Sequence, residues 1–230
     1  MKFTIPIFIT VRGHNDDEFD KNKEALKFSY LFIKKFNLFN QTYIISDNEN
    51  MLDYAKEMGF INIIYHPCKD DKEVRYLEYL ATHKYAVDNN YYPDWIILLN
   101  VNQLFKNNSL LIDCINNIDN NYNIIASYTE MTDKSKFFID DNMEIKNKYK
   151  REHLLSSEAN KVKVIDNSIY AVKTSFAFEC MNYEDPSEHF WNTKIKYFKN
   201  NSLTSDIYSL KDIQKYYKIL DIVNEVKKMK

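Results

Sequence analysis

Short apolar runs alternate with helical patterns through the first half of the chain. The predicted strands cover residues 4–10, 42–46, 61–65, 95–99 and 123–128. Between the strands, apolar residues recur every three or four positions, as in Phe28, Leu31, Phe32 and Phe36, which is typical of amphipathic helices. Unbroken apolar runs are typical of parallel strands buried on both faces. The alternation predicts an α/β fold, a three-layer α/β/α sandwich with a mostly parallel sheet.

The pattern changes after Tyr128. Residues 129–161 are polar and predicted to be irregular, and two strand candidates follow at 162–165 and 168–172. The last helical pattern, 210–220, begins with a capping arrangement of Ser209 and Asp212. We therefore expect one domain over residues 1–230, with 129–161 as an insertion. Because this insertion is too long for a simple connection, we expect it to cross to a partner in a homodimer.

The chain has only two glycines, and both lie at informative positions. Gly59 follows a helical pattern, where it would form a C-terminal cap. Gly13 follows the first strand, and glycine lets other atoms approach the backbone closely. Two interpretations of Gly13 remain open at this point: a loop that approaches phosphate, or an ordinary turn after a strand.

Composition and charge exclude several classes of protein. The net charge of −2 gives no general attraction to nucleic acid or to an anionic membrane. The cysteines, Cys68, Cys114 and Cys180, are odd in number and widely spaced, which fits a reducing compartment and no zinc cluster. The first apolar run is interrupted by Pro6 and is too short to span a membrane. We expect a cytoplasmic protein without membrane insertion.

Open α/β sheets bind ligands beyond the carboxyl ends of their strands, which directs attention to the loop after the first strand. That loop carries Arg12 and Lys21 ahead of a helix. A guanidinium can clamp phosphate oxygens and an ammonium adds a point charge, so the pair suits a phosphate site. The alternative is that both are surface cations neutralised by the four carboxylates between them.

The spacing of this loop resembles the signature of a known family. Arg12-Gly13, seven further residues and Lys21-Asn22 match the phosphate loop of the acylneuraminate cytidylyltransferases, the CMP-sialic acid synthetases and their relatives. The likeness continues, in order, through six further segments that cover most of the chain: residues 45–48, 55–59, 66–67, 98–106, 166–170 and 205–212.

The resemblance implies a site and a reaction. It implies transfer of CMP from CTP to a nonulosonic acid or another acidic sugar or phospho-compound, with release of pyrophosphate, as in sugar activation for surface polysaccharides. Arg12, Lys21 and Asp206 would be catalytic, with Asp206 holding Mg²⁺. The residues implied near the nucleotide are Gly13, Asn22, Asp47, Asn100 and Asn102. Residues 129–161 would supply acceptor contacts and the dimer surface.

The sequence departs from the family at several of these positions. Asp16 stands where the family has the lysine that meets the triphosphate, and Tyr208 stands where it has a second metal aspartate. A carboxylate near phosphate repels it, unless Asp16 recruits a metal ion. His66 and Asn100 replace an arginine and a glutamine.

Three functions therefore remain open. The first, which we favour, is a divergent cytidylyltransferase. The second is a binding or scaffold protein that keeps the fold without the chemistry. The third is a nucleotide-sugar-dependent glycosyltransferase, although Asn100-Val101-Asn102 lacks the two carboxylates of the usual metal motif.

Overall fold

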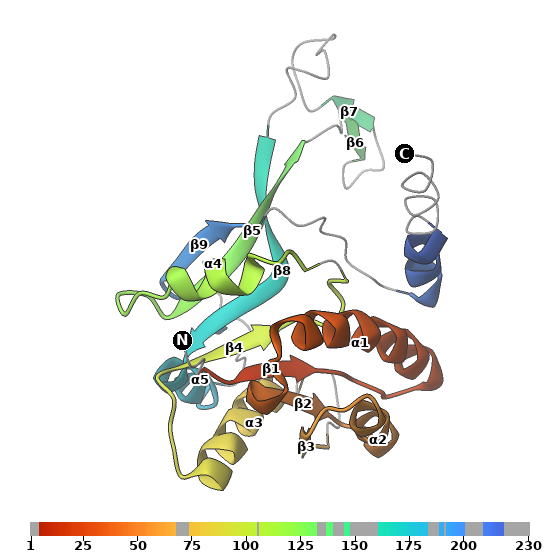
Figure 1. Ribbon diagram of the computed structural model, residues 1–230. Coiled ribbons are helices and arrows are strands. Elements are labelled where there is room, and N and C mark those ends of the chain that lie inside the picture. Colours follow the sequence, from red (N-terminus) through yellow and green to blue (C-terminus); the bar gives the residue numbers. More distant parts are fainter. Residues whose placement is uncertain are drawn as a thin grey trace.

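The computed structural model of the chain describes residues 5–67, 74–104, 106–132, 137–139, 145–147, 161–183, 189–190, 192–200 and 209–218 (Figure 1). The strands are β1 (Ile7–Thr10), β2 (Thr42–Ser46), β3 (Asn62–Tyr65), β4 (Trp95–Leu99), β5 (Ile124–Thr132), β6 (Phe137–Ile139), β7 (Ile145–Asn147), β8 (Lys161–Lys173) and β9 (Ile195–Lys199). The helices are α1 (Asp16–Phe36), α2 (Glu49–Glu57), α3 (Val74–Asn89), α4 (Leu110–Asn116) and α5 (Thr174–Cys180), with a 3-10 turn at Phe39–Gln41. Residues 210–218 are also helical.

Seven strands form one sheet in the order β3-β2-β1-β4-β8-β5-β9. The pairs β1–β2, β2–β3, β1–β4 and β5–β9 are parallel, and β8 is antiparallel to both of its neighbours. The carboxyl ends of β1 to β4 therefore lie along one edge of the sheet, as the sequence predicted.

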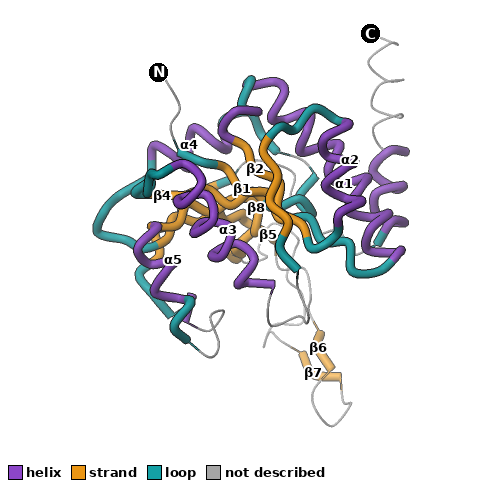
Figure 2. Tube along the Cα trace, turned by 90° about the horizontal axis from the view of Figure 1, so that it is seen from below, coloured by secondary structure: helices purple, strands orange, loops and turns teal. Residues whose placement is uncertain are grey.

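Helices cover both faces of this sheet (Figure 2). Alternate residues of β1 point to opposite faces, so Ile7 and Ile9 belong to one core and Phe8 belongs to the other. The first core contains residues of α1, α2 and α4, and the second contains residues of α3 and α5. All five residues of β4 are buried, as expected for a central strand. The three-layer α/β/α prediction is confirmed.

The two strands predicted at 162–165 and 168–172 form a single strand, β8. The polar residues that separate them lie in a bulge: Ala126 is opposite Tyr170, but Tyr128 is opposite Ile165. The polar break in the pattern marks this bulge and does not end the strand. The sequence prediction also missed β9, a half-exposed edge strand, and the short helix α5.

Residues 129–161 are less irregular than predicted. The pairing of β5 with β8 continues from Tyr128 to Thr132, and β6 pairs with β7 in a separate antiparallel sheet. The other residues of the segment lie outside the described part of the chain. Nothing in a single chain tests the predicted crossing to a partner.

Both helix caps predicted from the sequence are present. Gly59 has a φ of 100°, and its amide donates to the carbonyl of Lys56 at 2.8 Å. The amide of Phe60 donates to the carbonyl of Ala55, which completes a Schellman motif at the end of α2. At the C-terminal helix, the amide of Ser209 donates to the carboxylate of Asp212 at 3.0 Å. Within the described residues, no helix is long and apolar enough to cross a membrane.

Candidate functional site

A cavity of about 760 Å³ lies where the loop after β1 meets the first turns of α1. Its lining residues are Arg12, His14, Asn15, Asp17, Glu18, Asp20, Lys21, Ser209, Leu210 and Lys211. The start of the C-terminal helix forms one wall of the cavity, because this helix packs on α1: Ile213 is fully buried, and the Tyr217 hydroxyl donates to Glu24 at 3.1 Å. Two of the predicted phosphate-binding residues, Arg12 and Lys21, therefore line one cavity.

Gly13 is held by the loop after β2. Its amide donates to Asp47 Oδ1 at 3.0 Å, and its carbonyl accepts from Asn48 Nδ2 at 2.7 Å. A Cβ on Gly13 would lie 2.8 Å from Asn48 Cβ, so only glycine fits without a shift. Gly13 is thus needed for close approach, as one interpretation proposed, but the group that approaches is Asn48.

Helix α1 begins directly after this loop. The side chain of Asn15 caps it by accepting from the amide of Glu18 at 2.9 Å. The first turn carries Asp16, Asp17 and Glu18, whose negative charges stabilise the positive end of the helix dipole. Asp16 is exposed and is not among the residues that line the cavity. Its position gives it a role in helix formation, and the metal role predicted for it stays a prediction.

Arg12 lies between two carboxylates. Its Nε atom is 3.8 Å from Asp47 Oδ2 and 4.0 Å from Glu18 Oε1. The Asp47 side chain is only 4% exposed, so this carboxylate depends on nearby donors and positive charge. Arg12 therefore compensates a buried charge of the protein, and a bound phosphate would compete with Asp47 and Glu18 for it.

Lys21 is the second cation of the cavity. Burial lowers the pKa of its ammonium, Glu18 opposes this shift, and the positive charge of Arg12 adds to it. A partly desolvated ammonium next to another cation gains more from an anionic ligand than an exposed lysine does. Lys21 is therefore better placed than Arg12 to respond to phosphate.

The cavity as a whole is close to neutral. Its cations are Arg12, Lys21 and Lys211, and its carboxylates are Asp17, Glu18 and Asp20, so the formal charges cancel when His14 is neutral. Within the described chain, no three Asp, Glu, His or Cys side chains gather closely enough to hold a metal ion. These residues alone do not form a Mg²⁺ site, and Asp206 lies outside the described residues.

The other predicted site residues lie beside the cavity. Asn22 is buried, and its amide holds the loop by donating to the carbonyl of Arg12 at 2.8 Å. Asn100 follows β4 and accepts the amide of Asn102 at 2.9 Å. Neither Asn100 nor Asn102 lines the cavity, nor does Asp47. The structure thus places these predicted site residues along one edge of the sheet. Of them, Arg12 and Lys21 line the cavity, whereas Asn22, Asp47, Asn100 and Asn102 do not.

A buried polar cluster at the β8 bulge was not predicted as part of the site. Asp166 is 5% exposed, and its Oδ1 accepts from the Ser127 hydroxyl and, at 2.9 Å, from the amide of Ser168. The carbonyl of Ser168 accepts the amide of Asn100 at 3.1 Å. Asp166 Oδ2 is buried without a hydrogen-bond partner. The cluster fixes the loop after β4, and the sequence signal for it was an aspartate inside an apolar strand.

Lys106 lies beyond the same loop, near the middle of α1. Its ammonium donates to the carbonyl of Gln103 and, at 3.3 Å, to the hydroxyl of Ser29. Burial lowers the pKa of Lys106 to about 7. The side chain supports the join between α1 and the β4 loop, and it does not line the cavity.

Comparisons with known proteins find likeness in structure only. Neither a family model nor a curated protein sequence matches the chain. Among solved structures, a CMP:2-keto-3-deoxy-manno-octonic acid synthetase complexed with CTP aligns with a TM-score of 0.67 and 11% identity, over 95% of this chain and 99% of that one.

Two further structures show the same likeness. The 4-diphosphocytidyl-2C-methyl-D-erythritol synthase of Anaerococcus prevotii DSM 20548 aligns with a TM-score of 0.60 and 15% identity, over 94% of this chain and 98% of that one. A putative glucose-1-phosphate thymidylyltransferase of Bacillus anthracis aligns with a TM-score of 0.57 and 11% identity, over 92% and 93%. The chain therefore has the fold of these nucleotidyltransferases along nearly its whole length.

The contact between Gly13 and Asn48 can be tested with a double-mutant cycle. Gly13→Ala should destabilise the fold by about 1–3 kcal/mol, because its Cβ collides with a residue that also caps α2. Asn48→Gly removes the colliding atom and keeps a permitted cap residue. In urea unfolding, the double variant should lose less free energy of unfolding than the two single variants lose together.

Gly59→Ala is the matched control for this cycle. Gly59 has a left-handed backbone, so alanine there should lower the free energy of unfolding by about 1–2 kcal/mol. This loss should be additive with that of Asn48→Gly. Additive losses for Gly13→Ala and Asn48→Gly would contradict the contact.

The lowered pKa of Lys106 predicts a pH dependence of stability. An unfolded lysine titrates near 10.5, so between pH 7 and 10 the unfolded chain holds a proton that the folded chain has released. Stability should therefore rise with pH in this window, by at most about 1.4 kcal/mol per pH unit. Lys106→Met should lose this rise in chemical unfolding, whereas Lys84→Met, at an exposed position, should keep it. The prediction would be contradicted if the free energy of unfolding of the wild type and of Lys106→Met changed with pH in parallel.

Proposed function

We propose that this protein is a cytidylyltransferase that transfers CMP from CTP to the hydroxyl of an acidic sugar, such as a nonulosonic acid, and releases pyrophosphate. One observation carries the proposal: Arg12 and Lys21 line a single cavity at the carboxyl edge of a nucleotidyltransferase-type sheet. One structural neighbour, the CMP:2-keto-3-deoxy-manno-octonic acid synthetase, is complexed with CTP and is named for an acidic sugar. The likeness of the Arg12–Asn22 loop to the acylneuraminate cytidylyltransferases supports the same choice.

In this reaction the acceptor hydroxyl attacks the α-phosphorus in line with the leaving pyrophosphate. A P–O bond forms to the acceptor, the bond to the β-phosphate oxygen breaks, and the hydroxyl proton is released. The protein contributes mainly by positioning the groups and stabilising charge. Lys21 would hold phosphate oxygens by charge-assisted hydrogen bonds, and Arg12 would join it by turning from Glu18. Gly13 and Asn22 would keep this loop in place through their backbone and amide contacts.

Mg²⁺ is the proposed cofactor, and it would offset the negative charge of the triphosphate when bound. Asp206 remains the proposed ligand, with Asp16 as a second candidate from the sequence. The proposal also includes a homodimer built through residues 129–161, which light scattering would test: a monomer at tens of micromolar would contradict it.

A second function has a specific observation in its favour. The amide of Gly13 is already bonded to Asp47, and three carboxylates line the cavity. A protein that binds a nucleotide weakly and does not turn it over would have such a site. CTP binding without pyrophosphate release, for any acceptor, would support this alternative.

The proposed activity can be tested by pyrophosphate release. Each of the four nucleoside triphosphates should be incubated with Mg²⁺ and a panel of acidic sugars and phospho-compounds. Release with CTP and one acidic sugar is the expected result, and omission of Mg²⁺ should abolish it. Release with a different nucleotide, or with none, would contradict the proposal.

Lys21→Gln tests the phosphate role within this assay. Loss of one charged hydrogen-bond donor should weaken CTP binding by about 1.5–3 kcal/mol, roughly 10- to 100-fold. Lys23→Gln is the matched control, because Lys23 lies on the same helix but contacts the rings of Phe19 and Tyr54 and does not line the cavity. Equal CTP binding by the two variants would place the phosphates elsewhere.

A further inference from the structure

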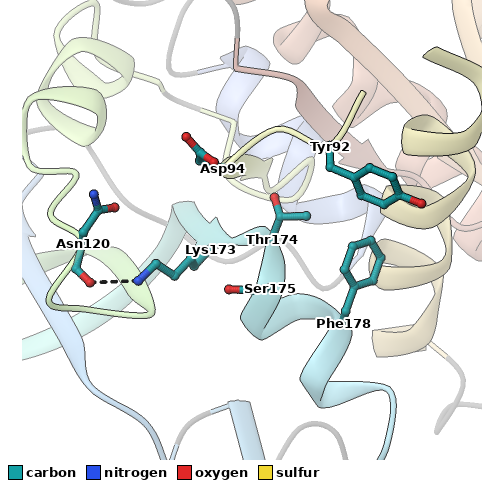
Figure 3. A pocket seen from close by; sticks show the side chains of 7 residues that line it. All are labelled: Tyr92, Asp94, Asn120, Lys173, Thr174, Ser175 and Phe178. Carbon is teal, nitrogen blue, oxygen red and sulfur yellow. Dashed lines mark hydrogen bonds between the residues drawn. The ribbon is translucent and has the colours of Figure 1, made fainter. Parts of the chain in front are cut away.

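A second cavity, of about 480 Å³, lies at the opposite edge of the sheet (Figure 3). Asp94 precedes β4 and Lys173 ends the antiparallel strand β8, so both lie far from the carboxyl ends of β1 to β4. The cavity shares no lining residue with the one at Arg12. It is therefore separate from the site of the proposed transferase function.

Opposite charges line this cavity without neutralising each other. Among the described residues, neither the Asp94 carboxylate nor the Lys173 ammonium takes part in an ion pair. Lys173 Nζ donates to the backbone carbonyl of Asn120 at 2.8 Å, which fixes its position and leaves further N–H donors. A ligand that enters between them meets an acceptor and a cation at different points of the wall.

Two aromatic rings form one end of the cavity. Tyr92 and Phe178 pack edge to face with their centroids 5.9 Å apart, and the Tyr92 side chain is 57% exposed. In Figure 3 these rings lie on one side of Thr174, and Lys173 with Asn120 lies on the other. The Asp94 carboxylate lies on the same side of Thr174 as Lys173 (Figure 3), so the rings form a separate, apolar end of the cavity.

Two hydrogen bonds join the segments that carry Asp94, Asn120 and Thr174. The amide of Thr174 donates to the carbonyl of Asp94 at 3.0 Å, and the indole of Trp95 donates to Asn120 Oδ1 at 3.3 Å. Thr174 is 4% exposed, yet its hydroxyl has no hydrogen-bond partner. A buried hydroxyl without a partner is unusual, and this one is shielded from the space of the cavity.

We propose that this cavity binds a small organic zwitterion, with its cationic end beside Asp94 and its anionic end beside Lys173. A neutral sugar would cover both charged groups without compensating either of them. A simple anion would meet Asp94, and a simple cation would meet Lys173. An amine that also carries a carboxylate or a phosphate compensates both, and the exposed hydroxyl of Ser175 can bond to it.

The experiment uses the full chain and three probes: L-phenylalanine, phosphocholine and glucose. The first two share an ammonium and an anionic group, and they differ in whether that anion is a carboxylate or a phosphate. Saturation-transfer NMR and calorimetry should show that at least one of them binds with a Kd of about 1 mM or tighter, and that glucose does not. Whichever of the two binds more tightly identifies the anion.

Substitutions assign the binding to this cavity. Asp94→Asn and Lys173→Gln should each weaken binding of the zwitterion at least about fivefold, and added salt should weaken binding to the wild type. Lys211→Gln, in the other cavity, is the control and should bind the zwitterion like the wild type. Thermal melts of each variant check that the fold is retained.

Binding of neither zwitterion would overturn the proposal, and so would binding that is unchanged in both Asp94→Asn and Lys173→Gln. Glucose bound as tightly as the zwitterions would also overturn it, because the charges would then have no role. CTP binding should be the same with and without the zwitterion present, so failure here leaves the proposed transferase function untouched.

Discussion

The hydrogen bonds between the loop after β1 and the loop after β2 are the constraint on which the candidate site depends. Asp47 and Asn48 bind both polar backbone groups of Gly13, and Asn48 also caps α2 through the amide of Met51. Because Arg12 precedes Gly13 and α1 starts three residues after it, this contact fixes the position of the Arg12 cation and of the start of the helix. Without it, the buried carboxylate of Asp47 would lose its donor, and the cavity wall would lose its anchor.

The same contact limits what the site can do. In a loop built only for phosphate, backbone amides and cations would await the ligand, but here the amide of Gly13 and the charge of Arg12 already serve Asp47. A carboxylate about 4 Å from a phosphate oxygen costs about 4 kcal/mol at the effective dielectric of a protein surface. If a triphosphate binds here, the three carboxylates of the cavity must therefore turn toward solvent. Lys21, which burial has already partly desolvated, is the group most favourable to such binding.

Much of this arrangement could be predicted from the sequence, because it depends on local pattern. The apolar runs predicted β1 to β5, and the glycine after a helical pattern predicted the cap at Gly59. What could not be predicted depends on pairing across the chain. The bulge that places Asp166 against Ser127 is visible only once β5 and β8 are in register, and the close approach to Gly13 comes from Asn48, which lies 35 residues away in sequence. Likewise, the spacing of Arg12 and Lys21 predicted their shared cavity, but it gave no sign that Asp47 engages Arg12.

The most direct test of phosphate binding by Arg12 and Lys21 is a crystal structure with a non-hydrolysable CTP analogue and Mg²⁺. We expect triphosphate oxygens within hydrogen-bonding distance of Lys21 Nζ and of the Arg12 guanidinium, with the Gly13 amide still bonded to Asp47. A triphosphate bound away from Lys21, with Arg12 still between Glu18 and Asp47, would contradict it.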